Sequence, residues 1–180
     1  MERRALDNLS INGKKIIGRP VLFNAESENL GGFVEIIAPS AFSEHLATSE
    51  LDVKALYEHD RKLLLGRTLS GTLTIKEDSQ GLMVEIDPPD TQTARDLIVS
   101  IERGDISGMS FGFVTDVDEW DYSRDPALRT VIKAKLLEVT VTSDPAYKQT
   151  DVQVAQRSLN QHNESRNINH KLHIELMELI

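Results

Sequence analysis

The sequence predicts a mainly β protein: an antiparallel barrel of about six to eight strands with a few short surface helices. Strand-like runs rich in β-branched and aromatic residues, separated by turn residues, recur through the first 147 positions. They outnumber helical segments by about three to one and do not alternate regularly with helices, as βαβ units would. A chain of 180 residues is also long enough to bury a core of its own as one domain.

The expected elements follow in order. Strands are expected at residues 15–23, 32–37, 52–57, 69–76, 82–87, 106–115 and 130–142. Residues 77–81 join the fourth and fifth of these strands as a hairpin, and an acidic loop at 116–125 joins the last two. A brief helix opens near Ser40, its expected N-cap. The clearest helix begins at Thr91 or Thr93, shows apolar residues at helical spacing, and ends at Gly104.

The amino-acid composition argues against several classes of function. Cysteine is absent, which excludes disulfides, thiolate zinc sites and cysteine nucleophiles. The chain carries 20 Lys and Arg against 29 Asp and Glu, a formal charge of −9, which argues against general binding to nucleic acid or anionic membranes. No run approaches the roughly 20 apolar residues of a membrane span, and the start lacks the apolar stretch of a secretory signal. These features predict a soluble intracellular protein.

A first candidate site is the string GMSFG at residues 108–112, which has the G-x-S-x-G pattern of a hydrolase nucleophile elbow. The parallel βαβ framework of that elbow is missing. Read as a strand, the string turns its large side chains to the core and leaves Ser110 on the other face, flanked by glycines where another backbone can approach. Ser110 is therefore the candidate nucleophile, Gly108 and Gly112 are candidate substrate contacts, and Ser107 is the next choice. The simpler interpretation is a barrel corner.

A second candidate is His59, at the end of the strand expected at 52–57. Apart from His45 in the brief helix, it is the only histidine in the region expected to fold. Its ordinary pKa near neutrality suits a general base, although a hydrogen-bonded structural histidine is the commoner role.

The third candidate is Glu138, which lies in an otherwise apolar strand. Strict alternation places Leu137 in the core and Glu138 on the other face, where its carboxylate could accept a hydrogen bond from an imidazole and fix its tautomer. A solvated sheet face is the simpler interpretation. Asp60 and Asp144 are the substitutes for this role.

The remaining segments suggest no metal or cofactor. Residues 151–180 read as a polar linker followed by a short amphipathic segment. His170 and His173 in that segment lack the further ligands of a metal site. The acidic loop at 116–125 lacks the spacing and glycine of a calcium loop.

Together, these motifs resemble those of the prohead proteases of tailed bacteriophages, capsid-maturation serine peptidases whose fold is similar to that of the herpesvirus assemblins. The resemblance rests on His59-Asp60, the string at 104–113, and the strand at 137–142 with Pro145-Ala146 after it. It covers about residues 15–150 and implies an assemblin-like barrel. Glu58 and Ser40 depart from it, because the family often has Asn and Gly there.

The resemblance also implies the chemistry and organisation of the chain. His59 matches the base, Ser110 the nucleophile and Glu138 the acidic third member of a catalytic triad. A protease domain is then expected at residues 15–150, preceded by an N-terminal extension at 1–14 and followed by the linker and amphipathic segment.

The implied function is a serine endopeptidase inside the prohead of a phage or prophage, in the host cytoplasm. It would cleave the scaffolding part of the major capsid protein and itself, with no cofactor, nucleic acid or membrane, and with self-association. A capsid scaffold or assembly chaperone that binds capsid protein without cutting it is the alternative. A small-molecule-binding barrel is a third reading, with less support because no cofactor motif is present.

Overall fold

The computed structural model describes residues 1–7 and 9–143, which form ten strands in two sheets, two α-helices and one 3-10 turn. The elements in chain order are β1 (Glu2–Asp7), β2 (Leu9–Asn12), β3 (Lys15–Leu22), β4 (Phe33–Ile37), α1 (Ser43–Leu46), β5 (Lys54–Tyr57), β6 (Asp60–Arg67), η1 (Thr68–Ser70), β7 (Leu73–Glu77), β8 (Gly81–Ile86), α2 (Gln92–Arg103), β9 (Gly108–Asp121) and β10 (Ala127–Thr142).

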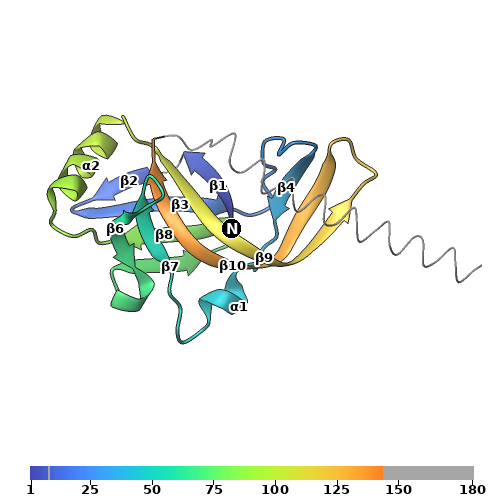
Figure 1. Ribbon diagram of the computed structural model, residues 1–180, viewed down its shortest axis with the longest axis horizontal. Helices are drawn as coiled ribbons and strands as arrows, with labels where there is room; N and C mark the ends of the chain where they lie inside the picture. Colours follow the sequence, from blue (N-terminus) through green and yellow to red (C-terminus); the bar gives the residue numbers. More distant parts are fainter. Residues whose placement is uncertain (8, 144–180) are drawn as a thin grey trace, which may run out of the picture.

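The larger sheet has the strand order β1-β9-β10-β5-β6, and β4 also pairs with β10. The smaller sheet has the order β2-β3-β8-β7. The long β9–β10 hairpin runs through the molecule, with α2 near one end and β4 beside the other (Figure 1). Because β10 spans 16 residues, the short strands β4 and β5 pair with successive parts of it, both in parallel.

The prediction of a mainly β protein is confirmed, whereas the barrel is not. The strand pairing forms two sheets that do not close on themselves. The expected antiparallel arrangement also holds only in part, since the β10–β4 and β10–β5 pairs are parallel.

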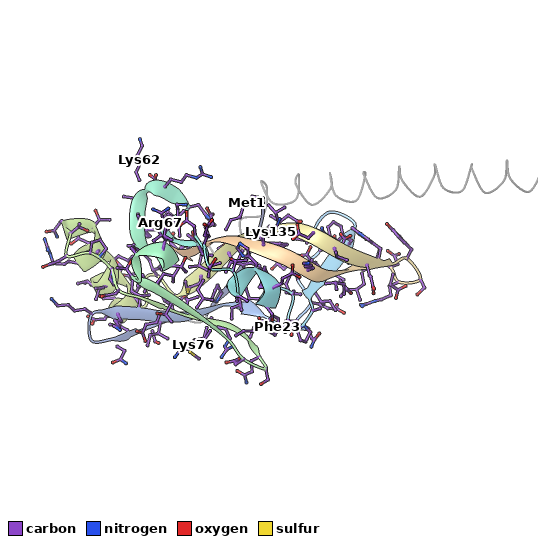
Figure 2. All side chains as sticks on the ribbon, turned by 90° about the horizontal axis from the view of Figure 1, so that it is seen from below. Met1, Phe23, Lys62, Arg67, Lys76 and Lys135 are labelled. Carbon is purple, nitrogen blue, oxygen red and sulfur yellow. The ribbon has the colours of Figure 1, made fainter. Side chains whose placement is uncertain are left out.

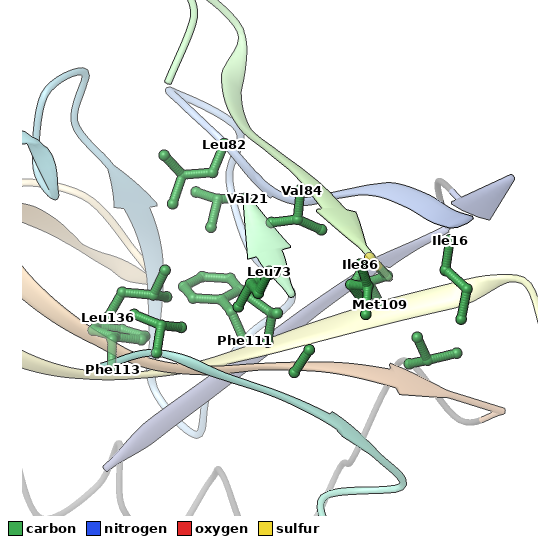
Figure 3. Close-up of a cluster of buried hydrophobic side chains, with 14 of the residues drawn as sticks. Ile16, Val21, Leu73, Leu82, Val84, Ile86, Met109, Phe111, Phe113 and Leu136 are labelled. Atoms are coloured by element: carbon green, nitrogen blue, oxygen red, sulfur yellow. The ribbon is translucent and has the colours of Figure 1, made fainter. Parts of the chain in front are cut away.

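The core lies between the two sheets. Alternate side chains of β9, Met109, Phe111 and Phe113, point toward apolar side chains of β3 and β8 such as Val21 and Leu82 (Figure 3). Each large side chain fully buried in this way contributes about 1.5–3 kcal/mol to folding. The opposite face of β9 is thereby left to the small residues between them.

Local signals predicted several elements correctly. Thr91 caps α2 by accepting a hydrogen bond from the Ala94 N–H at 3.3 Å, and Gly104 ends the helix with a left-handed backbone, φ 80°. The predicted hairpin is β7–β8. However, Leu69 and Ser70 lie in η1 rather than in the strand that was expected to begin there.

Two expectations near the helix α1 and the acidic loop are wrong. Ser40 is not the N-cap of α1: the cap position is Phe42, and Ser40 has a left-handed backbone with φ 66°, a conformation that glycine adopts more readily. The residues at 116–121 are not loop, because β9 continues to Asp121 and pairs with β10 over that length.

Residues 1–14, predicted as an extension, carry β1 and β2, which pair with β9 and β3. The linker and amphipathic segment at 151–180, the histidines at 170 and 173, Asp144 and Pro145-Ala146 lie outside the described residues. Within residues 1–7 and 9–143, no helix is long and apolar enough to cross a bilayer.

Candidate active site

Ser110 lies near the start of β9, on the face turned away from the core. Its partner across the β9–β10 pair is Thr140, and the next pair on this face joins Gly112 to Glu138. The Ser110 residue is 3% exposed, and Thr140 is fully buried. The two strands therefore bring a hydroxyl and a carboxylate to one sheltered face of the sheet.

A β-bulge at Leu137 sets the orientation of Glu138. Leu136 pairs with Phe113, but the next paired residue on β10 is Glu138, opposite Gly112, so Leu137 is the extra residue. Leu136 is fully buried in the core and Leu137 is 37% exposed. The prediction that Leu137 belongs to the core is thus wrong, because a bulge interrupts strict alternation and re-aims the side chains that follow it.

His59 lies in the tight turn between β5 and β6, just past the strand end where it was expected. Tyr57 pairs with Asp60, so Glu58 and His59 are the two central residues of the hairpin turn. Both have left-handed backbones, with φ of 50° and 57°. Such a turn matches the twist of the flanking strands, but residues other than Gly, Asn and Asp adopt it at a cost of order 1–3 kcal/mol each. The surrounding contacts must offset that cost.

The His59 ring contacts the Glu138 carboxylate directly. Nδ1 of His59 lies 2.7 Å from Oε1 of Glu138, and the two side chains are only 8% and 5% exposed. A carboxylate accepts hydrogen bonds only, so Nδ1 is the donor when the ring is neutral, and Nε2 then carries the lone pair. This is the tautomer that a general base needs, and the carboxylate would also stabilise the ring once it is protonated.

No hydrogen bond joins Ser110 to His59 within the described part of the chain. Within residues 1–7 and 9–143, the Ser110 hydroxyl makes no side-chain hydrogen bond. The Thr140 hydroxyl, on the residue opposite Ser110, is buried and also without a partner in this part of the chain. Catalytic hydrogen bonds often form only when substrate binds, so this geometry is compatible with Ser110 and His59 as candidate nucleophile and base.

The space over Gly112 is already filled. A β-carbon at this position would lie 2.8 Å from Cγ of Glu138 and 2.9 Å from Sδ of Met1. Both edges of β9 at residues 108–113 are also paired, to β10 on one side and to β1 on the other. A substrate strand could be added at this edge only after β1 leaves, and contact of substrate with Gly108 and Gly112 stays a prediction.

Asp60, Ser107 and His45 are placed differently from the His59–Glu138 pair. Asp60 is exposed, and its carboxylate accepts the Lys62 N–H at 2.8 Å. Ser107 is exposed and lies just before β9. His45 accepts the Leu136 N–H at 3.2 Å, so it joins α1 to β10 as a structural histidine.

The sequence does not reveal the contacts of Glu58, which it shows only as a departure from the family pattern. Its carboxylate accepts hydrogen bonds from the Thr142 hydroxyl at 2.9 Å and from the Ser143 N–H at 2.8 Å. No sequence signal identifies these partners, because they are 84 and 85 residues away. In the described segments, no group of three or more acidic or histidine side chains is arranged to hold a metal ion.

Comparison with known proteins identifies the family of this chain. A family model described as the caudovirus prohead serine protease matches residues 1–165 of the 180. The chain therefore belongs to the prohead serine protease family of tailed phages. Membership implies a serine peptidase of capsid maturation, with a capsid protein as its substrate and the prohead as its setting. Comparison with curated proteins and with solved structures found no match.

Proposed function

We propose that this chain is a serine endopeptidase in which Ser110 is the nucleophile, His59 the general base and Glu138 the carboxylate that orients the base. Its substrates are the scaffolding part of the major capsid protein and the chain itself. The observation that carries the proposal is the buried contact of 2.7 Å between His59 and Glu138, on the strand β10 whose neighbour β9 carries Ser110.

In the proposed reaction, Nε2 of His59 takes the proton of the Ser110 hydroxyl while Oγ attacks the peptide carbonyl carbon. The tetrahedral intermediate collapses to an acyl-enzyme, and His59 gives its proton to the leaving amine. A water molecule, deprotonated by His59, then hydrolyses the ester and regenerates Ser110. Glu138 stays ionised throughout and stabilises the imidazolium.

The resting separation of nucleophile and base requires one adjustment. A turn of the Ser110 side chain, or a small shift of the β5–β6 turn, must bring Oγ within about 2.6–3.2 Å of Nε2. Substrate that reaches this sheltered face would favour the shift by excluding water and occupying the space beside Ser110. Self-association and the interior of the prohead, both implied by the family resemblance, would concentrate enzyme and substrate for this step.

The test is co-expression with the major capsid protein of the same phage, followed by mass spectrometry of the capsid chain. The unchanged enzyme should release the scaffolding segment. Ser110→Ala and His59→Ala should lower the cleavage rate on the order of 10⁶-fold, and Glu138→Gln on the order of 10⁴-fold. Ser107→Ala, which removes an exposed neighbouring hydroxyl, is the matched control and should cleave normally.

The same experiment separates the protease from a scaffold or assembly chaperone. A chaperone would bind the capsid protein and leave it full length, and Ser110→Ala would then behave as the unchanged chain does. Normal cleavage by Ser110→Ala would refute the assignment of the nucleophile.

A further inference from the structure

The turn that presents His59 is anchored to β10 by the residue before the histidine. The Glu58 carboxylate accepts hydrogen bonds from the Thr142 hydroxyl at 2.9 Å and from the Ser143 N–H at 2.8 Å. The Glu58 N–H donates to the Val141 carbonyl at 3.0 Å. Glu58 thus makes hydrogen bonds to three consecutive residues, the last two of β10 and the residue that follows it.

The second anchor of the turn lies further back on the same strand. His59 contacts Glu138 at 2.7 Å, and Glu138 precedes Val141 on β10 by three residues. Thr140, the partner of Ser110, falls between the two anchor points. The turn therefore contacts β10 on both sides of Thr140, the residue that pairs with Ser110.

These anchors hold a backbone conformation that costs free energy. Glu58 and His59 both have left-handed backbones, and neither is a residue type favoured there. The β5–β6 hairpin that contains this turn projects from the sheet, and the exposed Lys62 lies at its outer end (Figure 2). Without the side-chain contacts of Glu58, the turn would keep the His59–Glu138 contact and the hydrogen bond of the Glu58 N–H as ties to β10.

We propose that Glu58 is a positioning residue, which fixes the imidazole of His59 against the Glu138 carboxylate through its hydrogen bonds to Thr142 and Ser143. It touches no reacting atom. This inference rests on the proposed function, because positioning matters for catalysis only if His59 is the base. A misplacement of a catalytic group by about 1 Å costs on the order of 10² in rate.

The test compares Glu58→Ala with the unchanged enzyme on the capsid precursor. Glu58→Ala should lower kcat on the order of 10²-fold with KM changed less than about twofold. It should also shift or broaden the Nδ1–H proton resonance of His59 in NMR spectra. Glu102→Ala, on the exposed side of α2, is the matched control and should change neither quantity.

A second pair of variants keeps the test decisive if Glu58→Ala does not fold. Thr142→Val removes one donor to Glu58, and Thr142→Ser restores it. The valine variant should lose part of kcat and shift the His59 resonance, and the serine variant should recover both. Recovery by serine would not occur if the site only needed the β-branched shape.

The outcomes distinguish the two levels of the proposal. A normal kcat and an unchanged His59 resonance in folded Glu58→Ala and Thr142→Val, beside an inactive Ser110→Ala, would overturn the role of Glu58 and leave the proposed function standing. Full activity of Ser110→Ala or His59→Ala would overturn both, whatever the resonance showed.

Discussion

At position 112, a single methyl group would disturb the site. The β-carbon of an alanine there would lie within 3 Å of Glu138 and Met1 side-chain atoms, closer than van der Waals contact permits. Glu138 is held by His59, so it cannot yield without loss of the 2.7 Å contact between them. Glycine at this position is thus required by the carboxylate of the site, and the sequence pattern alone had indicated only an approach of some other backbone.

We therefore expect Gly112→Ala to lower the cleavage rate on the order of 10²-fold, because the carboxylate moves away from the imidazole. The measurement is kcat on the capsid precursor, with folding checked by circular dichroism. Gly13→Ala, at a turn where a β-carbon meets no atom within 4 Å, is the control for glycine replacement as such. Full activity of Gly112→Ala would show that the Glu138 side chain can shift without consequence.

The three proposed catalytic residues could be named from the sequence because their motifs are local. A serine between glycines, a histidine before Asp60, and a lone Glu138 in an apolar strand are visible without a structure. The anchoring by Glu58 could not be predicted, because it depends on which strand end lies beside the β5–β6 turn. Long-range pairing of that kind leaves no trace in hydrophobic periodicity.

At the scale of elements, the bulge in β10 connects core and site. Because of the bulge, Leu136 points into the core, whereas Glu138 lies on the opposite face of the sheet, the face that also carries Ser110. The helix α1 lies against this part of β10 through His45, which accepts the Leu136 N–H just before the bulge. The N–H of Ala134 also donates to the Ala41 carbonyl at 2.9 Å. These contacts support the irregular part of the strand from the side of α1.

Helices and strands could be predicted where the signal lies within one segment. They could not be predicted where the structure depends on which strands pair with each other. The cap, periodicity and terminal glycine of α2 lie within one segment, so they predicted its limits closely. β6 was not predicted, because its polar first half has no strand pattern and pairs only because β5 lies next to it. The bulge at Leu137 was missed for a similar reason, since alternation in one strand carries no information about the register of its partner.

The contact of His45 with β10 makes stability depend on pH. Burial, and then the charge of Lys135, lower the pKa of His45 below 6.5, while Asp116 opposes them. The unfolded chain therefore binds a proton at a higher pH than the folded chain does. This contribution to stability is complete above about pH 6.5 and decreases as the pH falls below that value.

We expect the free energy of unfolding to fall between about pH 6.5 and 5, and His45→Asn to reduce that slope. Asn offers an oxygen acceptor to the Leu136 N–H but does not titrate in this range. Chemical denaturation at a series of pH values measures both. An identical slope in the two proteins would mean that His45 is not responsible.

At the scale of the whole molecule, one buried arginine joins four strands. Arg129 of β10 contacts Glu2 of β1, Glu35 of β4 at 2.9 Å and Asp118 of β9 at 2.7 Å. It also donates to the Thr115 hydroxyl at 3.0 Å. The side chains of Arg129 and Glu35 are 3% and 1% exposed, so each charge depends on the others for solvation.

Arg129→Met should destabilise the protein by about 3–5 kcal/mol, because it leaves the carboxylates buried without their cation. Denaturant titration measures the loss. Arg103→Met, which breaks an exposed ion pair with Asp105, is the control and should change the free energy of unfolding far less. A similar small cost at both positions would contradict the role assigned to Arg129.

The most direct test of the account is covalent labelling of the active protease with a fluorophosphonate, which reacts with an activated serine. Mass spectrometry of the digested protein should find one label, on Ser110, and none in His59→Ala. A label on Ser107 or another residue, or labelling of Ser110 that persists undiminished without His59, would contradict the assignment of nucleophile and base.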